Sequence, residues 1–162
     1  MVVQLTQKLF EKQVMHMKHF QSKKNLLLTL CTFIALQSWS FLSVAEVSVI
    51  VHKDNNASLD KKAISKLYLG KSKKFDNGRT ALLLNAAKGS PVRDEFNKKV
   101  IGRSSSQMNA HWSKLVFTGK GTPPKEIDSS SEIVSTVAEN KDTIGYVESS
   151  AVTDAVKVIA TF

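Results

Sequence analysis

The sequence contains little cysteine, few aromatic residues and no long apolar run, and each scarcity excludes a class of protein. Its one cysteine in 162 residues is Cys31, so no disulfide can form within the chain and a disulfide-stapled scaffold is excluded. Aromatic residues make up 7% of the chain and do not interleave with its lysines. A nucleic-acid-binding surface is therefore not expected, because such surfaces combine a basic stripe with aromatic side chains.

Motifs for catalysis and metal binding are also missing. The chain has no H-E-x-x-H motif, no paired cysteines and no G-x-S-x-G turn around a nucleophilic serine. Gly70-Lys71-Ser72 resembles the end of a nucleotide-binding P-loop, but Ser65 stands where the earlier glycine is required. His52 and His111 are interpreted as ordinary residues at the end of a strand and on the flank of a helix. We expect neither an enzyme nor a bound cofactor or metal.

The first 45 residues have the pattern of a secretory signal. Lys23 and Lys24 precede the apolar run "NLLLTLCTFIAL" (25–36), and "SVA" ends at Ala45 with the small residues that a signal peptidase reads, so cleavage is expected before Glu46. The run is shorter than the ~20 residues of a membrane-spanning helix. A retained N-terminal anchor stays open as the alternative.

The leader is long if translation begins at Met1, and a start at Met15 or Met17 would give it a more ordinary length. The remainder, residues 46–162, is sufficient for one domain with a single core. It holds 18 basic and 13 acidic residues, a net charge of +5. A mildly basic domain favours anionic partners in a general way.

Strand-like and helix-like segments alternate along residues 46–162. Strands are expected over 46–52, 81–84, 143–147 and 155–160, and helices over about 59–69, 90–101, 104–116 and 129–140. Ser129, with Glu132 three residues later, has the spacing of a capping box. This alternation indicates one α/β domain with a mixed sheet of about four to five strands flanked by helices.

The stretch "NAAKGSPVRDEF" (85–96) is the strongest candidate for a binding site. It follows a predicted buried strand and opens a helix, and ligands of open α/β sheets bind at the carboxyl ends of strands. Ser90 is a natural N-cap and Pro91 a natural first helical residue. Free N–H groups at the helix start, the serine hydroxyl and nearby basic side chains could together bind an anion. The candidate residues are Lys88, Gly89, Ser90, Val92 and Arg93.

A simpler interpretation competes with this one. Ser-Pro begins many helices that bind no ligand, because a capping serine needs only a partner in its own backbone.

Several segments taken together resemble the phosphate-binding proteins of ABC importers, which have the type 2 periplasmic solute-binding fold. The resemblance covers nearly all of residues 46–162 and lies in "VIVHKDN", "AISKLYLGKSKKF", "KGSPVRDEF", "HWSKLVFTGKGTPP" and "DTIGYVESSAV". It implies a periplasmic protein built as a single lobe of that fold. It also implies phosphate or a similar oxyanion as ligand and a membrane permease as partner.

The resemblance also shows where this chain departs from the family. In the family's phosphate loop the glycine and serine correspond to Gly89 and Ser90, whereas the arginine position holds Ala86 and the next two positions hold Pro91 and Val92. The second lobe, which closes over the anion, has no counterpart in the sequence. We therefore expect weak binding, or binding in an assembly in which a homo-oligomer or another protein completes the cleft. The alternative is a periplasmic interaction module that has lost the ligand and docks through "FTGKGTPPK" (117–125).

Overall fold

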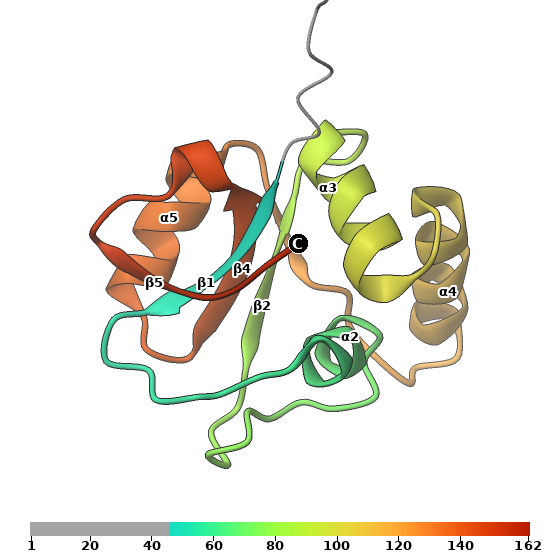
Figure 1. Cartoon of the computed structure of the whole chain (residues 1–162). Coiled ribbons are helices and arrows are strands. Elements are labelled where there is room, and N and C mark those ends of the chain that lie inside the picture. The colour runs from blue at the N-terminus through green and yellow to red at the C-terminus, as the bar shows by residue number, and fades with distance from the viewer. Residues whose placement is uncertain (1–45) are drawn as a thin grey trace, which may run out of the picture. The chain divides into compact units, whose positions relative to one another are not determined.

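A mixed sheet of five strands runs through residues 46–162, which are the part of the chain that the computed structural model describes (Figure 1). The strands are β1 (Val47–His52), β2 (Leu82–Ala86), β3 (Lys125–Ile127), β4 (Thr143–Glu148) and β5 (Val156–Thr161). Their order across the sheet is β3-β2-β4-β1-β5. β2 pairs in parallel with β3 and β4, and β1 pairs antiparallel with β4 and β5. The expected mixed sheet and α/β class are confirmed.

Helices cover both faces of this sheet. They are α2 (Lys61–Tyr68), α3 (Pro91–Phe96), α4 (Ser105–Phe117) and α5 (Ser130–Glu139). α3 continues directly into a π-helical turn, η1 (Asn97–Ile101), and a short 3₁₀ turn, η2 (Ser149–Ala151), follows β4. None of the helices in residues 46–162 has both the length and the apolar character needed to cross a membrane.

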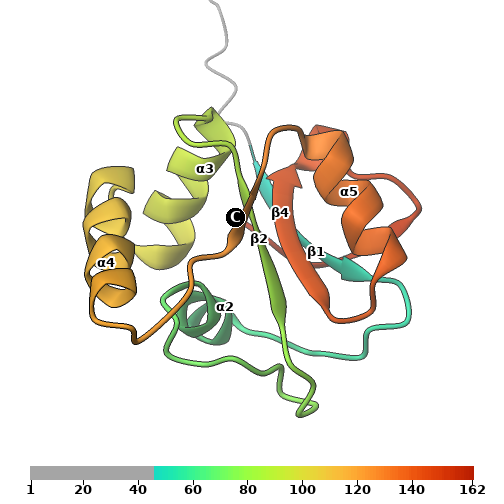
Figure 2. The ribbon, with the colours of Figure 1, turned by 180° about the vertical axis from the view of Figure 1, so that it is seen from behind.

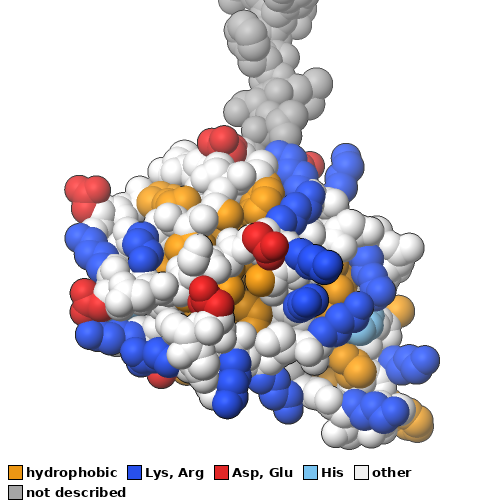
Figure 3. Space-filling model, turned by 60° about the horizontal axis from the view of Figure 1, so that its bottom comes forward, with side chains coloured by type: hydrophobic (Ala, Val, Ile, Leu, Met, Phe, Trp, Pro, Cys, Tyr) orange, Lys and Arg blue, Asp and Glu red, His pale blue; other side chains and the backbone are white. Residues whose placement is uncertain are grey.

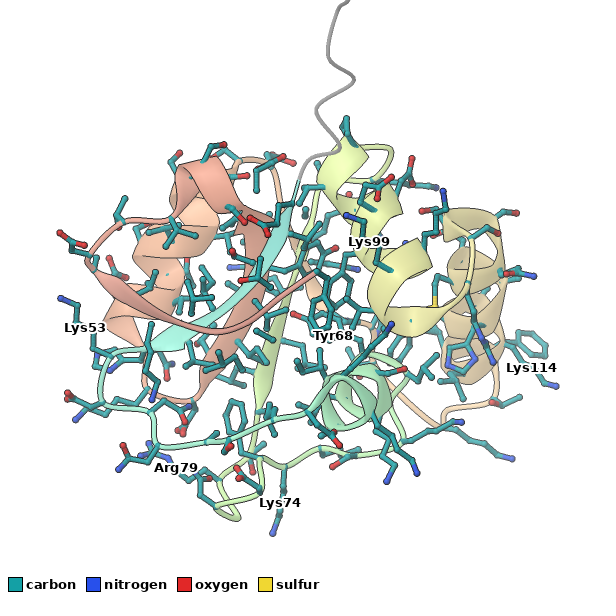
Figure 4. The ribbon with its side chains drawn as sticks, in the orientation of Figure 1. Lys53, Tyr68, Lys74, Arg79, Lys99 and Lys114 are labelled. Carbon is teal, nitrogen blue, oxygen red and sulfur yellow. The ribbon has the colours of Figure 1, made fainter. Side chains whose placement is uncertain are left out.

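Two adjacent residues of β4 show how the layers are divided. A Cβ atom on Gly145 would lie 2.7 Å from Cγ2 of Ile133 in α5, whereas the ring of Tyr146 stacks on Phe96 of α3 at a centroid distance of 3.8 Å. Successive residues of a strand point to opposite faces. Helix α5 therefore covers one face, and α3 covers the other together with α2, whose Tyr68 points inward to the same cluster (Figures 2 and 4).

Val92, Phe96 and Val100 stand four residues apart, the spacing of one face of a helix, and all three are buried in the core. Met108, Trp112, Leu115 and Val116 have the spacing of one apolar face of α4, but the expected burial is wrong at Val116, which is 53% exposed; the neighbouring Phe117 is 93% exposed. The physical reason is that α4 packs against η1 and lies outside the layer that touches the sheet (Figure 1).

The strand expected over 81–84 begins one residue later and ends two residues later, and it is not buried along its whole length. Leu82 is 48% exposed. Its register explains this exposure, because pairing with β3 begins only at Leu84, which is opposite Lys125. The first residues of β2 therefore have no strand beside them on that edge. β3 was not predicted, since three residues, two of them charged, carry no periodic apolar signal.

The predicted signal peptide, residues 1–45, lies outside the described residues and so does its last residue, Ala45. Glu46, on the other side of the expected cleavage point, is exposed immediately before β1.

Candidate functional site

The loop between β2 and α3 has the strand–loop–helix arrangement that the sequence predicts. β2 ends at Ala86, and the N–H of Ser90 donates to the carbonyl of Ala87 at 3.1 Å, which closes a turn. Gly89 has φ = 81°, a left-handed conformation that favours glycine. A Cβ atom on Gly89 would meet nothing within 4 Å. The loop backbone is therefore open to approach at the carboxyl end of β2.

Ser90 stands at the expected N-cap position, but its side chain does not cap the helix. Its backbone is extended (φ −72°, ψ 143°), and no side-chain cap bond forms. The hydroxyl oxygen is buried and has no hydrogen-bond partner within residues 46–162. By contrast, the hydroxyl of Ser104, the N-cap of α4, accepts from the N–H of Gln107 in a complete capping box. The cap hydrogen bond expected from Ser90 is therefore absent. A buried polar group without a partner costs about 1–3 kcal/mol of folding free energy.

Arg93 and Lys88 both donate to one carboxylate, that of Glu126. Arg93 Nη1 donates to Glu126 Oε2 at 2.8 Å and also to the carbonyl of Ala86 at 3.0 Å. The backbone N–H of Lys88 donates to Glu126 Oε1 at 3.1 Å. The Arg93 side chain is only 11% exposed, so its guanidinium is held in one orientation by the end of β2 and by β3. The Arg93 guanidinium is an expected donor, whereas Lys88 contributes its backbone N–H and not the side chain that was expected to bind the anion; both donate to one anionic group.

Glu126 is the functional residue that the sequence reasoning missed. The hydrogen bond from Arg93 holds the pKa of this carboxyl below its usual range. Its position depends on the pairing of β3 beside β2, with Glu126 opposite Asn85. No local pattern predicts that pairing. The nearest signal is Pro123-Pro124, shortly before Glu126, because proline in a sheet is found on edge strands or at the start of a strand.

The other candidate donors are distributed around the same loop. The Lys88 side chain is exposed, whereas Val92 is buried. The backbone N–H of Val92 has no acceptor among residues 46–162. All five candidate residues thus lie in one short segment, but only the donors of Lys88 and Arg93 meet at a single group.

The Tyr146 side chain holds the carboxyl end of β2 through two hydrogen bonds. Its hydroxyl donates to Asn85 Oδ1 at 2.5 Å and accepts from the N–H of Ala86 at 3.3 Å. Burial raises the pKa of this phenol well above its usual value. The stacked ring of Phe96 ties the same side chain to α3. The loop therefore starts from a strand end that is anchored by buried side-chain contacts.

The residues considered for other chemistry take part in local contacts. His52 Nδ1 accepts from the N–H of Asp54 at 3.0 Å, and His111 Nε2 lies 3.0 Å from the carbonyl of Leu69. Within residues 46–162 no three His, Cys, Asp or Glu side chains are grouped as metal ligands.

Comparison of the fold with solved structures identifies similar proteins of one kind. An ABC-type phosphate transport receptor from Vibrio cholerae superposes with a TM-score of 0.55 at 16% identity, over 72% of this chain. A protein from Clostridium perfringens, assigned as a phosphate ABC transporter substrate-binding protein and solved with bound phosphate, gives 0.57 at 24% identity over 72% of this chain. PstS from Borrelia burgdorferi gives 0.54 at 9% over the same share. The described region shares its fold with part of these receptors.

The match covers less than half of each of those proteins. It accounts for 46%, 45% and 47% of the three chains, respectively. At sequence level the chain matches no family model and no curated protein. The likeness therefore establishes the fold of the described region, and the neighbours are binding proteins rather than enzymes.

Proposed function

We propose that this protein is exported, with cleavage after Ala45, and serves in the periplasm as a solute-binding protein of the phosphate importer type. Its ligand is phosphate or a similar oxyanion. The binding site is the loop and helix start formed by Lys88, Gly89, Ser90, Val92 and Arg93. Binding is weak in the isolated chain, and a second copy or a permease component completes the cleft.

The carboxylate of Glu126 carries this proposal. A carboxylate and a phosphate present the same kind of acceptor, a negatively charged oxygen, to N–H donors. Lys88 and Arg93 already hold such an oxygen pair at 3.1 and 2.8 Å. The donors are therefore oriented for an oxyanion at the carboxyl end of a strand, where open α/β sheets bind ligands.

The same carboxylate explains why binding should be weak. A phosphate must displace Glu126 from Lys88 and Arg93, or lie beside its negative charge. The Glu126 side chain is 47% exposed on an edge strand, so it can rotate away. The exchange then replaces one charged acceptor by another, and a net gain requires the Val92 N–H, which has no acceptor among residues 46–162, and a movement of the loop that exposes the buried Ser90 hydroxyl. Each new charge-assisted hydrogen bond contributes about 1.5–3 kcal/mol.

The test is calorimetric titration of the full chain with phosphate and with sulfate. We expect saturable heat with a dissociation constant in the millimolar range, and at least a tenfold loss of affinity, about 1.4 kcal/mol, in both Ser90→Ala and Arg93→Ala. Arg79→Ala and Ser135→Ala are the matched controls. Arg79 forms an exposed ion pair with Asp142, and the Ser135 hydroxyl donates to a carbonyl on α5. Absence of heat, or equal heat in all four variants and the unsubstituted protein, would refute the proposal.

A further inference from the structure

A cavity lies at the opposite end of β2 from Ser90. Its volume is about 470 Å³, within the range of small-molecule sites. It is bounded by the end of α2, by the start of β2, by Trp112 of α4 and by the segment 120–125. Figure 2 shows this segment passing α2 on its way from α4 to the sheet. The cavity shares no residue with the proposed oxyanion site.

Its walls are mainly apolar. The apolar lining includes Leu67, Leu82, Leu83, Trp112, Pro123 and Pro124. The indole of Trp112 lies against two glycines, because Cβ atoms on Gly70 and Gly121 would come within 2.9 and 3.4 Å of its six-membered ring. The absence of side chains at these two positions makes room for this ring. Leu82 remains 48% exposed here because β3 does not extend beside it.

The charge around the cavity has one sign. Lys73, Lys120 and Lys125 line it, and no acidic residue does. None of these three lysines forms an ion pair with another described residue. Figure 3 shows Lys and Arg side chains gathering on the face that comes forward when the bottom of Figure 1 is turned toward the viewer. The rim therefore attracts negative charge that residues 46–162 do not supply.

Trp112 adds a polar feature to the apolar wall. Its indole nitrogen is buried and has no acceptor within residues 46–162. A buried donor without a partner is unfavourable, and an acceptor brought close to this ring would relieve it.

We propose that this cavity binds an organic anion with a flat apolar body, such as an aromatic carboxylate. The ring of the ligand packs on Trp112 and Leu82, and offset stacking on an indole is a favourable aromatic geometry. Its carboxylate faces the ammonium groups of the three lysines. Inorganic phosphate lacks an apolar body and would leave the apolar wall uncovered, so this ligand class differs from that of the oxyanion site.

The experiment follows the indole N–H resonance of Trp112 in the isotope-labelled full chain. The chain has two tryptophans, and Trp112→Phe assigns the signal by removing it. Naphthoate is the probe, and neutral naphthamide, which has the same rings, is its matched control. We expect naphthoate to move the Trp112 resonance saturably and to bind more tightly than naphthamide. Leu82→Ser should weaken both probes.

Substitution of the lysines separates charge from shape. Lys73→Gln, Lys120→Gln and Lys125→Gln should each weaken naphthoate about threefold, the scale of an exposed ion pair. The triple variant should bind naphthoate no better than naphthamide. Lys53→Gln, a lysine near the opposite end of the molecule from α4 (Figure 4), should change nothing. The amide spectrum of each variant shows whether it is folded.

Three results would overturn the proposal. One is equal affinity for naphthoate and naphthamide, and another is unchanged naphthoate affinity in the folded triple variant. The third is competition between phosphate and naphthoate, which would mean that the two ligands share a site. Failure of phosphate binding in the calorimetric test would leave these outcomes unaffected.

Discussion

Glu126 decides how open the oxyanion site is. Its carboxylate takes the N–H of Lys88 and the guanidinium of Arg93, two donors that would otherwise face solvent or ligand. The glutamate side chain is 47% exposed and the arginine side chain 11% exposed, so the pair is intermediate between an exposed pair, which contributes about 0–1 kcal/mol to stability, and a buried one. In a Glu126→Gln variant the Arg93 guanidinium keeps its hydrogen bond to the Ala86 carbonyl, which limits the loss of stability.

Glu126→Gln should tighten phosphate binding by roughly five- to tenfold. The amide oxygen can still accept from Lys88, but the negative charge that repels the ligand is gone, and two unit charges at close range in water interact by about 1 kcal/mol. Calorimetric titration of this variant beside the unsubstituted protein measures the change. Glu139→Gln, on the exposed end of α5, is the control. Unchanged or weaker binding in Glu126→Gln would show that Glu126 is not a competitor of the ligand.

The packing of α5 on β4 depends on a missing side chain. Gly145 lies in the middle of β4, where an added Cβ atom would approach Ile133 Cγ2 to 2.7 Å and Val137 Cγ2 to 3.4 Å. Gly145 is therefore a site of close approach between a helix and a strand, and it sets the distance between two layers of the fold.

Gly145→Ala should destabilise the protein by about 1–3 kcal/mol, because the added methyl group overpacks a dense core. The effect should be smaller in an Ile133→Ala background, where the atom that it meets is gone. Urea unfolding of the two single variants and the double variant measures this coupling. Additive free energies of unfolding would contradict the contact as its cause.

The molecule as a whole is built around a buried aromatic cluster that joins three elements. Tyr68 of α2, Phe96 of α3 and Tyr146 of β4 contact one another, with centroid distances of 4.7, 3.8 and 5.7 Å. Tyr68 also donates from its hydroxyl to the carbonyl of Leu84 in β2. Burial raises the pKa of both phenols well above the usual value of about 10.

These two residues are the only tyrosines of the chain, so alkaline titration reports directly on the core. Because the pKa of each phenol is raised on folding, its contribution to stability is complete below pH ~10 and falls as the pH rises above that value. We expect no tyrosinate absorbance until the protein unfolds, and then a steep rise that coincides with loss of the far-ultraviolet circular dichroism. Tyr146→Phe should halve the absorbance change. A gradual rise centred near pH ~10 in the folded protein would contradict the buried cluster.

Local sequence patterns predicted most of the elements, and they failed where an element depends on a distant neighbour. The caps and apolar spacing around Ser90, Ser104 and Ser129 are local signals, and helices begin after each of them. β3 has three residues and exists because β2 lies beside it. The same pairing brings Glu126 to Arg93, which lies 33 positions away in the chain. The carboxylate half of the site could not be predicted without it.

The sequence by itself determined the order of helices and strands, the position of the loop at Gly89 and Ser90, and the burial of Val92, Phe96 and Val100. These features depend on backbone conformation and on spacing within one element. Only the tertiary structure decided that the Ser90 hydroxyl is buried without a partner, that Glu126 accepts from Lys88 and Arg93, and that Trp112 lines a cavity at the other end of β2. Each of these outcomes depends on which distant side chains the sheet brings within hydrogen-bonding or packing distance, and local spacing carries no information about that distance.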